Sequence, residues 1–131
     1  MNQRLLANAR NAGNFECGIH ASDSCLAFLD INPLVKGHTL VIPKKEVDYI
    51  FDLDDDLYHE LFAFARKISS GIRKSVPCKR IGVAVIGLEV PHAHIHLVPL
   101  NVMGDINFSN PKLSPSAEEL SEIAGEIASN I

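Results

Sequence analysis

Three histidines alternate with apolar residues in the second half of the chain. The segment HAHIHLVP, residues 92 to 99, places His92, His94 and His96 at every second position. Successive side chains of an extended strand point to opposite faces, so this spacing predicts a strand with the three imidazoles in one row. Imidazole can act as a nucleophile, a general acid or base, or a metal ligand near neutral pH. The segment therefore constrains both the fold and the chemistry.

Length and composition predict one globular domain over residues 1–131. The chain has 131 residues, 47% apolar and 21% charged, with a net charge of −4. This charge excludes the broad basic surface of a general nucleic-acid binder, and no apolar run is long enough to span a membrane. Three widely spaced cysteines do not form a disulfide framework and favour a reducing compartment, so we expect a cytoplasmic protein.

The order of elements predicts an α+β fold with a mainly antiparallel sheet. Residues 25–29 and 38–42 read as neighbouring strands, and four aspartates in residues 52–56 begin a long central helix. Two further strands are expected in residues 79–86 and 92–99, as adjacent central strands, and Ser116 with Glu119 resembles the capping box of a short C-terminal helix. Residues 1–20 appear irregular, residues 24–100 carry the motifs, and residues 101–131 form a loop and a helix.

Three interpretations of the histidine row compete. The first is structural, because a strand histidine is commonly a satisfied polar residue. The second is a metal site, although positions i and i+4 of one strand stand roughly 13 Å apart at about 3.3 Å per residue, too far to share one ion. The third is a catalytic site in which the histidines have different roles. The middle imidazole attacks the substrate, while its neighbours orient it, bind anionic oxygens or protonate a leaving group. A linear row fits the third best.

Two segments resemble the histidine triad (HIT) family of nucleotide hydrolases and transferases. HAHIHLVP is similar to the family's signature, and CLAFLDINPLVKGHTLVIPKK resembles its nucleotide-binding half, so the resemblance covers residues 24–100. It implies a homodimer of α+β subunits whose strands join across the interface. It also implies a phosphoramidase-like hydrolase that acts at the α-phosphorus of a purine nucleoside phosphoramidate or related nucleotide, without a metal or cofactor.

The resemblance also implies roles for individual residues. His94 would be the nucleophile that forms a nucleotidyl-histidine intermediate, His92 and His96 would flank it, and His38 would face the row. A histidine poised near pH 7 would protonate the departing nitrogen. The expected nucleotide-binding residues comprise a ribose-hydroxyl acceptor, two neighbours of the base, and two residues of the link before the histidine row: Asp30, Phe28, Ile31, Gly87 and Glu89. Without the resemblance, Asp30 reads as a turn residue and Phe28 as core.

The chain departs from the family pattern ahead of the histidine row. Many members carry a longer glycine-rich loop with a polar pair there, whereas this chain has VIGLEVPH, with Leu88 and Glu89. An ionised Glu89 would repel a phosphate or accept a leaving amine. A catalytically weak nucleotide-binding module therefore stands as the alternative to an enzyme. Cys17 and His20 have the spacing of half a zinc site, but no second half is evident, so structural zinc is not expected.

Overall fold

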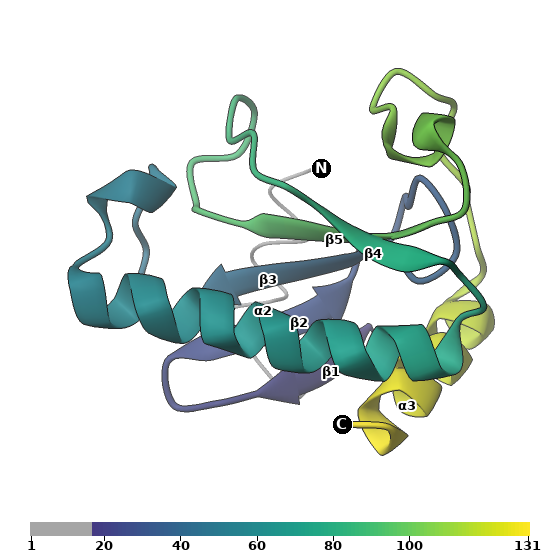
Figure 1. The fold of residues 1–131 in the computed structure, drawn as a ribbon, viewed down its shortest axis with the longest axis horizontal. Helices are drawn as coiled ribbons and strands as arrows, with labels where there is room; N and C mark the ends of the chain where they lie inside the picture. The colour runs from purple at the N-terminus through teal and green to yellow at the C-terminus, as the bar shows by residue number, and fades with distance from the viewer. Residues whose placement is uncertain (1–16) are drawn as a thin grey trace.

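A five-stranded antiparallel sheet forms the centre of the molecule (Figure 1). The computed structural model describes residues 17–131. The strands lie in the order β1-β2-β3-β5-β4, and each neighbouring pair is antiparallel. Their bounds are β1 Gly18–Ala21, β2 Cys25–Leu29, β3 Thr39–Pro43, β4 Arg80–Ala84 and β5 Ile95–Leu100. The α+β class with an antiparallel sheet is confirmed.

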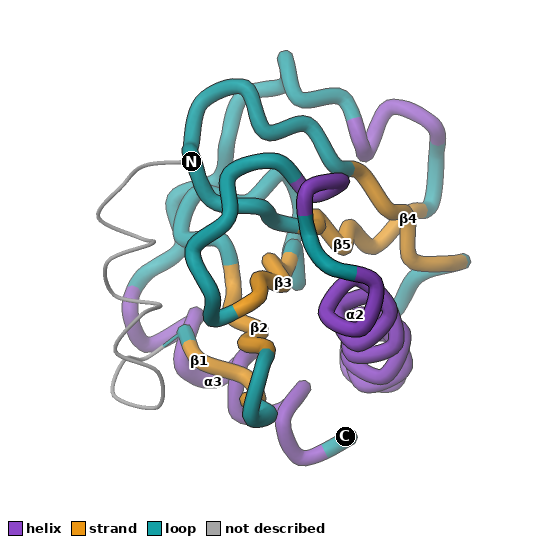
Figure 2. The backbone as a smooth tube through the Cα atoms, turned by 90° about the vertical axis from the view of Figure 1, so that its left-hand side faces the viewer, coloured by secondary structure: helices purple, strands orange, loops and turns teal. Residues whose placement is uncertain are grey.

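Helix α2, Asp55–Ser75, lies across one face of the sheet (Figures 1 and 2). It begins where the aspartate run predicted, because the Asp54 carboxylate accepts a hydrogen bond from the backbone N–H of Leu57 at 2.9 Å. Its apolar stripe, which includes Leu61, Phe64 and Ile68, is buried against the strands. Burial of this stripe is what holds the helix to the sheet.

Helix α3, Ala117–Ser129, packs against α2 and β1. The predicted cap is confirmed, because the Ser116 hydroxyl accepts a hydrogen bond from the Glu119 backbone N–H at 3.2 Å. Two short 3₁₀ helices, η1 Ile50–Asp52 and η2 Met103–Ile106, lie in the connections. No helix in residues 17–131 has the length and apolar character needed to cross a membrane.

The face of the sheet away from α2 carries the histidines. Leu40 is the direct cross-strand partner of Phe28 on one side and of His96 on the other, so these three side chains share a face. His38 lies two residues before Leu40 and points the same way. Apolar residues of this face form a second core cluster, separate from the one beneath α2: Leu26, Phe28, Leu40, Ile42 and Val90.

Three predictions about the strands are wrong. Strand β1 lies partly in the segment that was expected to be irregular, because its four residues show no apolar alternation and form a strand only by pairing with β2. Residues 1–16 of that segment lie outside the described part of the chain. Strand β5 begins at Ile95, since the N–H of Ala93 bonds to the carbonyl of Val47 outside the ladder. Strand β4 is shorter than residues 79–86 and lies at the edge of the sheet beside β5, so of these two strands only β5 has neighbours on both sides.

Candidate active site

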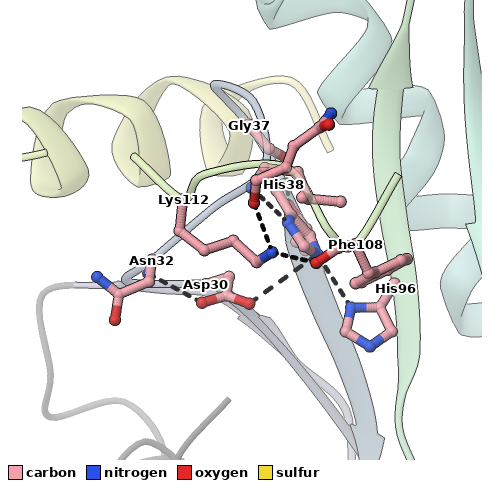
Figure 3. A network of polar contacts seen from close by, with 10 residues as sticks. Asp30, Asn32, Gly37, His38, His96, Phe108 and Lys112 are labelled. Atoms are coloured by element: carbon pink, nitrogen blue, oxygen red, sulfur yellow. Dashed lines mark hydrogen bonds and ion pairs between the residues drawn. The ribbon is translucent and has the colours of Figure 1, made fainter. Parts of the chain in front are cut away.

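Two of the histidines are joined side chain to side chain. His38 immediately precedes β3 and His96 lies in β5, and the His38 Nε2 atom is 3.0 Å from the His96 Nδ1 atom (Figure 3). The neighbouring strands β3 and β5 set this distance, because Leu40 and His96 are register partners. Asp30, at the end of β2, places its Oδ2 atom 4.0 Å from the same His38 nitrogen. The sheet therefore gathers one carboxylate and two imidazoles from three adjacent strands.

The hydrogen-bond partners fix the tautomers of this pair. The backbone N–H of Leu34 donates to His38 Nδ1 at 3.0 Å, so that nitrogen carries no proton. The proton of neutral His38 therefore sits on Nε2 and is donated to Nδ1 of His96. His96 in turn carries its own proton on Nε2. Both imidazoles are neutral, and the Nε2–H group of His96 is left as a donor.

The side chain of His94 has the opposite tautomer. Its Nδ1 atom lies 2.7 Å from the carbonyl oxygen of His92, and a carbonyl only accepts, so His94 carries its proton on Nδ1. The Nε2 lone pair is consequently available for attack on an electrophile. The ring centroids of His94 and His96 are 5.0 Å apart, which places the bare nitrogen and the donor in one site.

The ring of His92 is hydrogen-bonded to the main chain at the end of β3 and to neither of the other two rings. Its ring is fully buried, its Nε2–H donates to the carbonyl of Pro43 at 2.7 Å, and its Nδ1 atom has no hydrogen-bond partner. Strand β5 begins only at Ile95, so residues 92–94 lie outside it, but Ala93, Ile95 and Leu97 share the core beneath α2 as the alternate spacing predicted. What His92 offers to the site is its backbone carbonyl, which positions His94.

Burial keeps the imidazoles uncharged. It lowers the pKa of His38 to about 4 and that of His96 to about 3, and it also lowers the pKa of His94. The expectation of a histidine poised near pH 7 is therefore wrong for these three residues. Burial acts oppositely on the carboxyl of Asp30 and raises its pKa. The site therefore presents a neutral imidazole with an N–H donor, His96, and one with an unprotonated nitrogen, His94.

A cavity of about 260 Å³ opens onto His94 and His96. The link between β4 and β5 forms one part of its wall and includes Gly87 and Glu89, two of the expected nucleotide-binding residues. Gly87 has a positive φ of 72°, which glycine adopts without strain, so the link can turn sharply there. The remaining lining residues come from the same link and from the loop after β5: Ile86, Leu88, Val90, Phe108 and Lys112.

The predicted nucleoside residues lie beside this cavity and do not line it. Phe28 is buried in the second core cluster, and Ile31 is partly buried against both clusters. The Oδ1 atom of Asp30 accepts the backbone N–H of Asn32 at 2.9 Å, which is a turn contact, while Oδ2 faces His38. Asp30 is thus both a turn residue and a neighbour of the histidines (Figure 3).

Two residues of the site had no signal in the sequence. Phe108 packs its ring edge against His96, with centroids 4.8 Å apart, and more distantly against His38 at 6.2 Å. Lys112 follows on the same loop. Both stand in a polar stretch without periodicity, and only the folding of residues 101–116 over the site brings them to the histidines.

The three side chains Asp30, His38 and His96 also have the donor types of a metal site. Their potential ligand atoms all lie within 4.8 Å of one another. The Nε2 atom of His38 carries a proton, however, and would have to lose it while Nδ1 still accepts from Leu34. Metal ligation requires an unprotonated nitrogen, so the arrangement suits a hydrogen-bond chain rather than an ion.

Cys17 and His20 do not form part of a metal centre within residues 17–131. The Cys17 side chain is buried in the core beneath α2. The ring of His20 stacks on Phe64 of α2, with centroids 5.8 Å apart. Both residues serve packing.

Comparisons with known proteins identify the family of this chain. The family model for the HIT domain matches residues 17–103. An uncharacterised HIT-like protein of Borreliella burgdorferi is 32% identical over 121 residues, covering 86% of this chain and 87% of that protein. The adenosine 5′-monophosphoramidase hnt1 of Schizosaccharomyces pombe is 31% identical over 108 residues, covering 81% of each. The crystal structure of a Hit-like protein from Bartonella henselae aligns with a TM-score of 0.78 and 25% identity over 97% of this chain and 95% of that one. The chain belongs to the HIT family.

Proposed function

We propose that this protein hydrolyses or transfers at the α-phosphorus of purine nucleoside phosphoramidates or related nucleotides, through a nucleotidyl intermediate on His94. The observation that carries the proposal is the hydrogen bond from His94 Nδ1 to the His92 carbonyl, which leaves Nε2 unprotonated. This nitrogen belongs to a residue that lines a cavity together with His96 and Gly87. The similarity to a fission-yeast adenosine 5′-monophosphoramidase supports the same reaction class.

The reaction proceeds in two displacements. In the first, His94 Nε2 forms a bond to phosphorus and the phosphorus–nitrogen bond breaks, so that the amine leaves with the electron pair and takes a proton from solvent. In the second, water attacks phosphorus, the bond to His94 breaks, and one proton returns to solvent. Charge that develops on the phosphoryl oxygens is stabilised by the Nε2–H donor of His96.

The nucleoside is held on the side of Asp30. Its buried carboxylate keeps Oδ2 free of backbone contacts, and a ribose hydroxyl can donate to it. Ile31, which is partly buried, offers apolar surface to the base, and the fully buried Phe28 belongs to the core cluster against which Ile31 packs. A purine presents more such surface than a pyrimidine.

A weak enzyme that serves as a nucleotide-binding module is the second candidate. The observation in its favour is Glu89, whose side chain lines the cavity beside His94 and His96. An ionised carboxylate there repels an anionic phosphate, which carries the reacting phosphorus, but does not repel the uncharged nucleoside. It therefore lowers the rate of hydrolysis more than it lowers the affinity for the nucleoside. Release of product from a phosphoramidate separates the two candidates.

We also propose a homodimer formed through β4. This strand is at the edge of the sheet, where its outer backbone groups can pair with a second copy. Apolar side chains gather near it and are exposed: Val83, Val85, Ile86, Tyr49 and Phe51. Residues 49–51 and 85–86 line one shared cavity, so these side chains belong to one exposed apolar region and are not isolated apolar residues on the surface.

The test is AMP release from adenosine 5′-phosphoramidate, with His94→Ala beside the wild type and with a chelator present. We expect chelator-resistant turnover that is lost in His94→Ala, and acid-labile nucleotide on the quenched wild type. His59→Ala is the control, because His59 is an exposed histidine of α2 outside the site. Nucleotide binding without turnover would favour the binding module, and loss of turnover with chelator would favour a metal site.

A further inference from the structure

Within residues 17–131, one cationic side chain lines the cavity at His94 and His96. Lys112 lines the cavity of His94 and His96, and no other lysine or arginine does so. Figure 3 shows its side chain extending past Asp30 toward His38. The residue stands in a loop without sequence signal, yet it lies where an anionic substrate would have to bind.

The ammonium group of Lys112 is held in place by its own loop. Its Nζ atom donates to the carbonyl of Phe108 at 2.6 Å and to that of Asn110 at 3.0 Å. An ammonium has three donors, so one remains for a ligand. The nearby Asp30 carboxyl interacts with this charge, because burial of Asp30 raises its pKa most strongly while Lys112 lowers that pKa.

The loop that carries Lys112 is itself fixed to the site. The Leu113 backbone N–H donates to the carbonyl of Pro33 at 2.9 Å, which ties the loop to the turn between β2 and β3. Phe108 packs against the ring of His96. These contacts make the ammonium a preorganised group, and a preorganised donor loses little entropy when it binds an anion.

The imidazoles cannot supply the positive charge. His38 accepts at Nδ1 from Leu34, and His96 accepts at Nδ1 from His38, so neither is an imidazolium. Glu89 adds a carboxylate to the cavity wall. An anionic phosphoryl group at His94 therefore needs a cation from elsewhere, and Lys112 is available.

We propose that Lys112 binds the non-bridging phosphoryl oxygens of the nucleotide at His94, and so makes the site select nucleoside 5′-phosphates and their derivatives over uncharged nucleosides. The inference rests on the proposed function for the placement of phosphorus at His94. A purely structural lysine, one that only closes the turn over residues 108–112, is the competing explanation.

The test compares the affinities for AMP and adenosine, measured by calorimetry on the full chain. Lys112→Met removes the charge and keeps the apolar stem. We expect it to weaken AMP binding by about tenfold or more and to leave adenosine binding within about twofold, because a charge-assisted contact to phosphate is lost and nothing else. Lys112→Arg should retain most of the AMP affinity. Lys45→Met, at an exposed lysine outside the cavity, is the matched control.

Equal weakening of both ligands by Lys112→Met would overturn the proposal and indicate a structural role, as would unchanged affinity for both. Retained adenosine binding also shows that the variant is folded. The two proposals fail separately. If the wild type releases no AMP from the phosphoramidate but its AMP affinity depends on Lys112, the hydrolase fails and this inference stands. If turnover needs His94 and neither AMP affinity nor kcat/KM changes in Lys112→Met, this inference fails alone.

Discussion

The Nε2–H group of His38 donates to Nδ1 of His96, and the backbone N–H of Leu34 sets the direction of that bond. His38 therefore acts as a positioning residue, since it fixes the tautomer in which His96 presents its Nε2–H. His38→Phe keeps an aromatic ring at this buried position but removes the donor. We expect nitrogen NMR to show His96 as the Nε2–H tautomer in the wild type and as a mixture in His38→Phe, with a loss in kcat of about tenfold or more. An unchanged His96 spectrum in the variant would contradict the assignment.

The free energy of unfolding should decrease as the pH is lowered from 6.5 toward 4. The unfolded chain protonates its histidines near pH 6.5, whereas burial delays protonation of His38 to about pH 4 and of His96 to about pH 3 in the folded chain. In this window the unfolded state binds more protons, so each group costs up to about 1.4 kcal/mol per pH unit. Urea unfolding across this range measures the slope. His38→Phe/His96→Phe should flatten it, and an equal slope in that double variant would assign the effect to other groups.

Gly37→Ala should destabilise the fold. Gly37 has a φ of 89°, and an added Cβ would lie 2.9 Å from Cγ2 of Val76 and 3.3 Å from Cγ of Pro99. Backbone strain and the close contact together predict a loss of about 1–3 kcal/mol in the free energy of unfolding. Gly104→Ala is the control, because an added Cβ there meets no atom within 4 Å. Equal unfolding midpoints in urea for the two variants would show that the contact at Gly37 relaxes without cost.

Val83→Lys should dissociate the proposed dimer. Val83 is 57% exposed on the edge strand β4, and a lysine there opposes pairing with the same strand of a second copy. We expect sedimentation to give a dimer for the wild type and a monomer for Val83→Lys. Val102→Lys, at a side chain 64% exposed in the loop after β5 and outside the β4–β5 ladder, should remain a dimer. A wild type that sediments as a monomer at every concentration would rule out the interface.

The fold could be predicted from the sequence where one local pattern decided an element. The aspartate run and the apolar spacing located α2, and Ser116 with Glu119 located the start of α3. Strand β1 could not be predicted, because its order comes from pairing with β2. The position of β4 at the edge of the sheet could not be predicted either, since the order of strands in a sheet depends on contacts between segments that are distant in the sequence.

The site was predictable in its residues and less so in its geometry. His38, His94 and His96 come together, whereas the His92 ring bonds to the carbonyl of Pro43, because residues 92–94 make their hydrogen bonds outside the ladder that begins at Ile95. Phe108 and Lys112 belong to the site through the course of one loop, and no residue pattern marks them. Burial set the charge state of the imidazoles, which the residue type alone would place near neutrality.

The group that orients His94 is a main-chain carbonyl, that of His92. Every amino acid carries such a carbonyl, so no substitution at position 92 can remove the acceptor. Substitution of the His92 side chain therefore does not change the tautomer of His94. That tautomer is lost only if the main chain takes a different path through residues 90–94. A genetic screen for inactive variants should therefore find backbone-altering changes in this turn, such as prolines or insertions, more damaging than replacement of the His92 ring by a side chain of similar volume.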